Sequence, residues 1–143
     1  MKKLTTILAL AFIWPALLAE AELLTIKVAG IKVFGGKLML AVCSDSESFA
    51  DVEGAVLKQE IPLTLEEPFD QIKYQADLPC GQYAIKVFHD INSNDKLDRN
   101  WLGKPVEPWG VTNNVRPFLR APSFKESLFT FDRTKTTITV ELE

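Results

Sequence analysis

Residues 72–88 read IKYQADLPCGQYAIKVF and contain two runs in which apolar and polar side chains alternate. The apolar positions of the two runs are Ile72, Tyr74, Ala76 and Leu78, then Tyr83, Ile85, Val87 and the adjoining Phe88. A period of two is the pattern of a half-buried β-strand. The Pro79-Cys80-Gly81 segment between the runs is typical of a turn. This stretch therefore predicts two strands joined by a tight turn.

The same alternation recurs on both sides of this stretch. The further predicted strands are residues 24–28, 38–42, 127–131 and 136–142. Gly35-Gly36 precedes the second of them, and because such a dipeptide tolerates positive φ angles, we expect residues 24–28 and 38–42 to pair as a hairpin. Helical signals are weak, and we expect only a short turn or two of helix within residues 46–57.

About six short strands separated by turns predict an all-β fold, an antiparallel β-sandwich, because a sheet with one apolar face must bury it against another layer. A small barrel is the alternative. Residues 91–123 form one long irregular loop with no clean period, although they contain Trp101, Trp109 and Phe118. A connection of this length within a compact domain is usually functional or disordered, and its aromatic residues favour a function.

The N-terminus has the three parts of a secretory signal peptide. Lys2 and Lys3 supply positive charge, residues 4–18 supply a short apolar run, and Ala19-Glu20-Ala21 supplies a small-x-small cleavage site. A run of about 15 residues is shorter than the roughly 20 that a membrane-spanning helix needs. We therefore expect a signal peptide over residues 1–21, cleavage before Glu22, no stable membrane anchor, and a periplasmic or extracellular protein.

Residues 22–143 are then of the usual length for a single domain with its own core. The chain of 143 residues has a net charge of −3 and no cluster of Lys or Arg after the leader. Nucleic acids and anionic membranes attract clustered positive charge. The composition therefore argues against both as partners, and favours an unidentified protein or glycan of the cell envelope.

The chain has two cysteines, Cys43 and Cys80. An even number of cysteines in an exported chain favours a disulfide bond, because the compartment is oxidising. We therefore expect Cys43 and Cys80 to be bonded, with a pair of buried free thiols as the alternative.

The segment after the strand that ends at Phe88 has the spacing of a calcium-binding loop. The predicted metal ligands are Asp90, Asn92, Asn94, the backbone carbonyl of Lys96, and Asp98. Alternate residues of a tightly curled loop point inward, so that these oxygens can converge on one cation. Calcium is therefore the one expected cofactor, bound weakly.

Two positions depart from that pattern. Asp95 stands where the sharp turn normally has glycine, and Trp101 stands where a bidentate glutamate is usual. Water or a distant carboxylate such as Glu107 would have to complete the coordination shell. The alternative is a metal-free turn in which the Asp and Asn side chains accept hydrogen bonds from their own backbone.

Three motifs in this region carry a family resemblance. They are Leu78-Pro79-x-Gly81-x-Tyr83-Ala84-Ile85, His89-Asp90-x-Asn92-x-Asn94-x-Lys96-Leu97-Asp98, and Leu102-Gly103-x-Pro105-x-Glu107-x-x-Gly110-x-x-Asn113-Asn114. In combination they resemble domain-of-unknown-function family 2141, a family of exported bacterial proteins, over essentially the whole chain after the leader. The resemblance implies a secreted sandwich similar to the transthyretin-like or carboxypeptidase-regulatory-like modules, with no assigned activity. The family more often has glycine at the position of Asp95.

These observations favour a non-enzymatic binding or accessory module of the cell envelope, with residues 91–123 as its contact surface. One alternative is a carbohydrate-binding module in which the rings of Trp101 and Trp109 stack on sugars, unless both rings pack over the open end of the sandwich. The other is a transthyretin-like hydrolase, which needs several polar groups converging in a cleft. The chain offers one histidine, His89, and no nucleophile motif. No catalytic residue is therefore predicted.

Overall fold

The computed structural model describes residues 20–64 and 71–143. The predicted leader lies almost entirely outside the described residues, since only Glu20 and Ala21 fall within them. The helices and strands, in chain order, are β1 (Ala21–Ala29), β2 (Lys37–Cys43), α1 (Ser46–Asp51), β3 (Leu57–Pro62), β4 (Gln71–Pro79), β5 (Gly81–Asp90), β6 (Trp109–Val111), the 3₁₀ helix η1 (Thr112–Asn114), α2 (Phe124–Ser127), β7 (Phe129–Phe131) and β8 (Thr137–Glu141).

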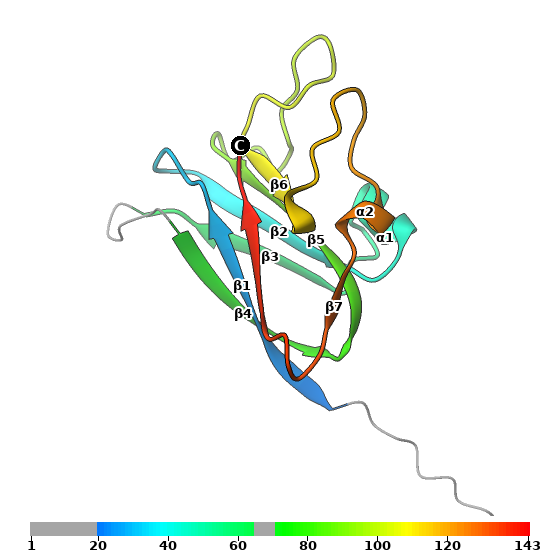
Figure 1. The fold of residues 1–143 in the computed structure, drawn as a ribbon. Coiled ribbons are helices and arrows are strands. Elements are labelled where there is room, and N and C mark those ends of the chain that lie inside the picture. The colour runs from blue at the N-terminus through cyan, green and yellow to red at the C-terminus, as the bar shows by residue number, and fades with distance from the viewer. Residues whose placement is uncertain (1–19, 65–70) are drawn as a thin grey trace, which may run out of the picture.

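The strands form two sheets that face each other, so the predicted all-β sandwich is confirmed (Figure 1). One sheet has the order β4-β1-β8, and the other has the order β3-β2-β5-β6, with β7 paired to the start of β5. All pairs are antiparallel except β1 with β8, which is parallel.

The alternating residues bury one face of each strand. In β1 the side chains of Leu24, Ile26 and Val28 are fully buried, and in β5 those of Ile85 and Val87 lie in the same core. Phe131 of β7 is also fully buried there. The core between the sheets therefore comes from the period-two pattern that predicted the strands.

The predicted hairpin between residues 24–28 and 38–42 is wrong. β1 pairs with β4 and β8, whereas β2 pairs with β3 and β5. The connection from Gly30 to Gly36 carries the chain from one sheet to the other. Gly36 has a φ of +67°, and a Cβ atom placed there would lie 2.2 Å from the carbonyl oxygen of Asp90. The glycines serve this close crossing between the sheets and not a hairpin turn.

Other elements differ from the sequence-based expectation in detail. The short helix expected within residues 46–57 is α1, capped by Asp45, whose side chain accepts a hydrogen bond from the Ser48 backbone N–H. The sequence does not predict β3, because Leu57 and Ile61 are its only large apolar residues apart from Pro62. It lies half-buried at a sheet edge. The irregular segment 91–123 contains the short strand β6, which pairs with Lys86–Phe88 of β5.

No helix within the described residues is both long and apolar enough to cross a membrane.

Candidate functional site at the Asp90–Asp98 loop and the apolar tip

The chain leaves β5 at Asp90 and returns to the same sheet as β6, so residues 91–108 form an excursion between neighbouring strands. The return is fixed by the backbone N–H of His89, which donates to the carbonyl of Pro108 at 2.8 Å, and by the pairing of Phe88 with Trp109. In Figure 1 this excursion projects from one end of the sandwich, together with the loop that precedes α2.

Asp90 organises the start of the excursion, which we call the Asp90–Asp98 loop. Asp90 is fully buried, and its carboxylate accepts hydrogen bonds from the backbone N–H groups of Asn94 (3.0 Å) and Asp95 (2.8 Å). Asp95 has a φ of +65°, the left-handed conformation that the sequence pattern required at this position. Aspartate therefore adopts the turn geometry that glycine provides more readily.

The Asp95 carboxylate also forms an ion pair with Lys37 at the start of β2, and Glu60 of β3 contacts the same ammonium group at 2.8 Å. Hydrogen bonding to Asp95, and then to Glu60, raises the pKa of Lys37. The loop is thereby attached to the edge of the β3-β2 pair.

The side chains of Asn92, Asn94 and Asp98 meet on the inner side of the loop. The amide nitrogens of Asn92 and Asn94 donate to the two carboxylate oxygens of Asp98 at 2.7 and 2.9 Å. Their amide oxygens accept from backbone N–H groups two residues further along, those of Asn94 and Lys96. These are Asx turns, the alternative to a metal site that the sequence left open.

Glu107 closes the loop from the other side. It is 7% exposed, and its two carboxylate oxygens accept from the backbone N–H groups of Ile91 (2.9 Å) and Asp98 (3.0 Å). From the sequence, Glu107 is expected only as a distant carboxylate that could complete the coordination shell of a metal. Its contacts are instead with the two ends of the loop, which it holds together.

The donor chemistry of the loop suits calcium, which prefers hard carboxylate, amide and carbonyl oxygens. The loop is closed by its own hydrogen bonds. The side-chain N–H groups of Asn92 and Asn94 contact the Asp98 carboxylate where a bound cation would contact it. Among the described residues, no three Asp, Glu, His or Cys side chains are grouped as metal ligands. Calcium would therefore need the two amides to turn their oxygens inward, and calcium binding stays a prediction.

A second feature lies at the outer end of the excursion. Asn100 makes a tight turn there: its backbone N–H donates to the Lys104 carbonyl, and its side-chain oxygen accepts from the N–H groups of Leu102 and Lys104. Trp101 and Leu102 stand at this turn with 91% and 60% of their surfaces exposed. The turn therefore holds two large apolar side chains in water.

The loop before α2 adds to the same surface. Phe118 is 85% exposed and Leu119 is 87% exposed, and the ammonium group of Lys104 lies 5.5 Å from the centre of the Phe118 ring. This cation–π contact places the two loops side by side. We call this surface the apolar tip, and its residues are Trp101, Leu102, Val106, Phe118 and Leu119.

Trp101 and Trp109 lie in different environments, although both are in the irregular segment. Trp109 is half-buried in β6 and packs against a second core cluster that includes Val111. The Arg116 guanidinium lies 5.0 Å from the centre of the Trp109 ring and donates to the Trp109 carbonyl. Trp109 is therefore part of the packing, and Trp101 alone of the two presents a nearly free ring.

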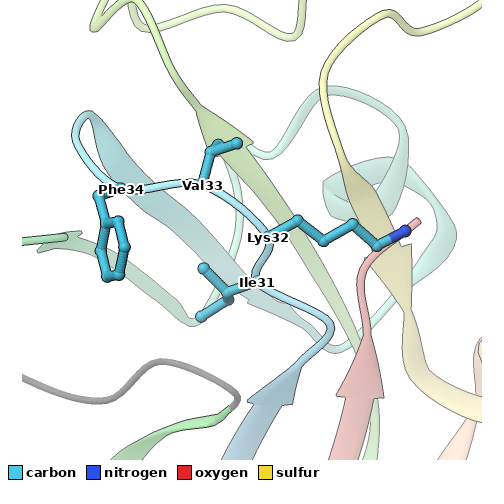
Figure 2. A pocket seen from close by; sticks show the side chains of 4 residues that line it. All are labelled: Ile31, Lys32, Val33 and Phe34. Atoms are coloured by element: carbon cyan, nitrogen blue, oxygen red, sulfur yellow. The ribbon is translucent and has the colours of Figure 1, made fainter.

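His89 is fully buried within the sheet, where its Nε2 lies 2.7 Å from the carbonyl oxygen of Gly35 and its Nδ1 has no hydrogen-bond partner. Its ring contacts the crossing connection at Gly35 and is closed to solvent. That connection also borders a shallow pocket lined by residues 31–34, whose side chains Figure 2 shows pointing in different directions and not around a common centre.

The predicted disulfide is wrong, because Cys43 and Cys80 are both free cysteines. Cys43 is buried at the end of β2 and pairs with Ala84 of β5, whereas Cys80 is exposed at the corner between β4 and β5. The strand residues between Cys80 and Ala84 separate the two positions by on the order of 10 Å, since a strand rises about 3.3 Å per residue. A disulfide requires Cα atoms within about 7 Å.

Comparison with known proteins agrees with the resemblance that the motifs carry. No curated protein and no solved structure matches this chain. The model of one family, described as an uncharacterized protein conserved in bacteria (DUF2141), matches residues 26–139. This range includes all or part of every strand of both sheets, the Asp90–Asp98 loop and the apolar tip, and the chain therefore belongs to the DUF2141 family.

Proposed function

We propose that this protein is an exported β-sandwich module that acts by binding a component of the cell envelope through the apolar tip, and not by catalysis. The observation that carries the proposal is the exposure of Trp101, Phe118 and Leu119, each of which is at least 85% exposed. Large apolar side chains this exposed on two adjacent loops exceed the scattered single residues of an ordinary surface, and such a concentration is typical of an interaction site.

The local structure supports a binding role for these side chains. The turn at Asn100 is fixed by four hydrogen bonds to its neighbours, and the Arg99 guanidinium donates to the Gly103 carbonyl at 2.8 Å. A turn held in this way loses little conformational entropy when it contacts a partner. The tip is thus pre-organised, while Glu107 and the Asp90–Asp98 loop hold its base.

Calcium is the proposed stiffener of that base, with Asp90, Asn92, Asn94, Asp98 and the carbonyl of Lys96 as its ligands. Support comes from the inward convergence of Asn92, Asn94 and Asp98. The ion would take the place of the Asn92 and Asn94 amide N–H groups as the partner of the Asp98 carboxylate, and would bring positive charge to it. Because only Asp90 and Asp98 of these five ligands are charged, we expect a dissociation constant of about 10⁻⁴ to 10⁻³ M, the range of extracellular modules.

Carbohydrate binding is the second candidate, and the nearly free ring of Trp101 favours it. Stacking on sugars by Trp101 and Trp109 as a pair has less support, because Trp109 packs against the protein and Arg116 lies over its ring. Quenching of Trp101 fluorescence by neutral oligosaccharides would distinguish this candidate from the first.

A photoreactive amino acid at position 101 tests the proposed function in cells that export the protein. The control is the same amino acid at Val56, which is 49% exposed and pairs with Val42 at the other end of β2. We expect adducts with an envelope component from position 101 and far fewer from position 56. Equal yields from the two positions would show that the apolar tip is not a binding surface.

A further inference from the structure

We propose that the apolar tip docks onto a lipid layer with anionic headgroups, inserting Trp101, Leu102, Phe118 and Leu119 among the lipids. The inference rests on the proposed binding function and names the chemistry of the partner. It follows from the charge, the shape and the residue types of the two loops that form the tip.

The net charge of the chain argues against an anionic partner, but that charge is unevenly distributed and the tip differs in sign from the molecule as a whole. Residues 99–122 contain four basic residues, Arg99, Lys104, Arg116 and Arg120, and one acidic residue, Glu107, whereas the whole chain has a net charge of −3. The remainder of the molecule is therefore distinctly acidic. In front of an anionic layer such a charge distribution turns the tip towards the surface and the rest of the protein away from it.

Two of these basic residues are available to a ligand. Arg99 and Lys104 form no ion pair within residues 20–64 and 71–143, while Arg116 is paired with Glu143 and Arg120 with Glu126. Lys104 lies against the Phe118 ring, so a positive charge and an apolar side chain are presented together. This juxtaposition matches a lipid interface, where phosphate groups lie directly above hydrocarbon.

The acidic groups nearest the tip oppose this attraction only weakly. Asp98 accepts hydrogen bonds from the amides of Asn92 and Asn94, and Asp95 is paired with Lys37. Glu107 is buried, and both of its carboxylate oxygens accept backbone N–H groups. The negative charge at the base of the excursion is therefore satisfied within the protein.

Shape favours a fluid partner over a protein surface. The loops that carry the tip project from the end of the sandwich in Figure 1, and Trp101, Phe118 and Leu119 are each at least 85% exposed. Trp101 and Phe118, the two largest side chains of the tip, would together bury on the order of 300–500 Å², whereas each partner of a stable protein complex buries roughly 800 Å². Tryptophan also favours the membrane–water interface, where its ring meets both environments.

Vesicle binding by the purified exported protein tests the inference. The probes are vesicles of phosphatidylcholine alone and vesicles containing about one-third phosphatidylglycerol, with sedimentation and tryptophan emission as readouts. A Trp109→Phe background assigns the emission to Trp101. We expect binding to the anionic vesicles with a blue shift, and weaker binding when salt is raised from about 0.1 to 1 M.

Matched variants separate insertion from non-specific adhesion. Trp101→Ser should lower the partition coefficient about tenfold, because it removes the largest apolar surface of the tip. Val106→Ser and Lys104→Gln should weaken binding, whereas Val56→Ser and Lys73→Gln, at exposed positions outside the tip, should not. Equal binding of Trp101→Ser, or equal binding to both vesicle types, would overturn the inference.

The two proposals can fail separately. Adducts from position 101 with a protein alone, and no binding to anionic vesicles, would overturn lipid docking and leave the binding module in place. Adduct yields at position 101 no higher than those at position 56 would overturn both. Adducts with phospholipid at position 101, together with the expected vesicle binding, would support both.

Discussion

Cys43 and Cys80 have the same side chain in opposite environments. Cys43 is fully buried and its thiol donates to the Ser48 carbonyl at 3.3 Å, whereas Cys80 is exposed at the β4–β5 corner. Burial raises the pKa of the Cys43 thiol, and the nearby Lys86 ammonium offsets this only in part. Since the thiolate is the reactive form, Cys43 is protected both by the fold and by its pKa.

We therefore predict two free thiols that react at very different rates. In the native protein at pH 8, a thiol reagent such as dithionitrobenzoate should modify one cysteine rapidly, and Cys80→Ser should abolish that phase. The second thiol should react only when the protein is unfolded. A count of zero thiols in denatured, non-reduced protein would contradict this prediction and restore the disulfide.

At the scale of a single element, the Asp90–Asp98 loop can be compared with the turn between β7 and β8. In that turn Asp132 also accepts hydrogen bonds from backbone N–H groups, those of Thr134 (2.8 Å) and Lys135 (2.9 Å). Both turns are thus organised by an aspartate at their start. Only the Asp90–Asp98 loop adds two amides and a second aspartate on its inner side.

This difference leads to a prediction about calcium. At about 1 mM calcium, a dissociation constant of roughly 0.1 mM would add about 1.4 kcal/mol to the free energy of unfolding, which raises the melting temperature by a few degrees. Asp90→Ala should lower the melting temperature without calcium and should abolish the rise, because it removes the charged first ligand. Thermal unfolding with calcium and with a chelator measures both effects.

Asp132→Ala is the matched control for that measurement. It removes the aspartate of an Asx turn outside the proposed site, so its melting temperature should still rise with calcium. If calcium up to several millimolar leaves the melting temperature of the original protein unchanged, the Asp90–Asp98 loop is a hydrogen-bonded turn without a metal.

At the scale of the whole molecule, one crossing connects the β1 sheet to the β2 sheet beside the candidate site. Gly35 and Gly36 both have positive φ angles, +87° and +67°. A Cβ atom at Gly36 would lie 2.2 Å from the Asp90 carbonyl oxygen, whereas a Cβ atom at Gly35 would meet no atom within 4 Å. Because the crossing passes so close to Asp90, a change at Gly36 would displace both the connection between the sheets and the start of the Asp90–Asp98 loop.

This pair of glycines gives a prediction with an internal control. Gly35→Ala should cost about 1 kcal/mol, because it introduces only backbone strain. Gly36→Ala should cost more, about 2–4 kcal/mol, since the backbone must also move away from Asp90. Urea unfolding of both variants measures the difference, and equal costs would show that the contact with Asp90 is not constraining.

The sequence by itself determined the longer strands β1, β2, β4, β5 and β8, the sandwich, and the turn that starts at Asp90. The alternation in residues 72–88 and the Asp-x-Asn-x-Asn spacing act between neighbours in the chain, and they operate in the same way in any surroundings. β4, β5 and the hydrogen bonds of Asp90 with Asn94 and Asp95 accordingly lie where those patterns place them.

Only the tertiary structure decided which strands pair, where the cysteines lie and which tryptophan is exposed. β1 pairs with β4 and β8, whereas the crossing at Gly36 carries β2 into the other sheet. There Cys43 pairs with Ala84 of β5, which lies four residues along the chain from Cys80. Trp101 and Trp109 are only eight positions apart, yet β6 pairing leaves Trp109 half-buried, and the turn at Asn100 exposes Trp101. Such outcomes depend on contacts between residues far apart in the chain, and no local pattern encodes them.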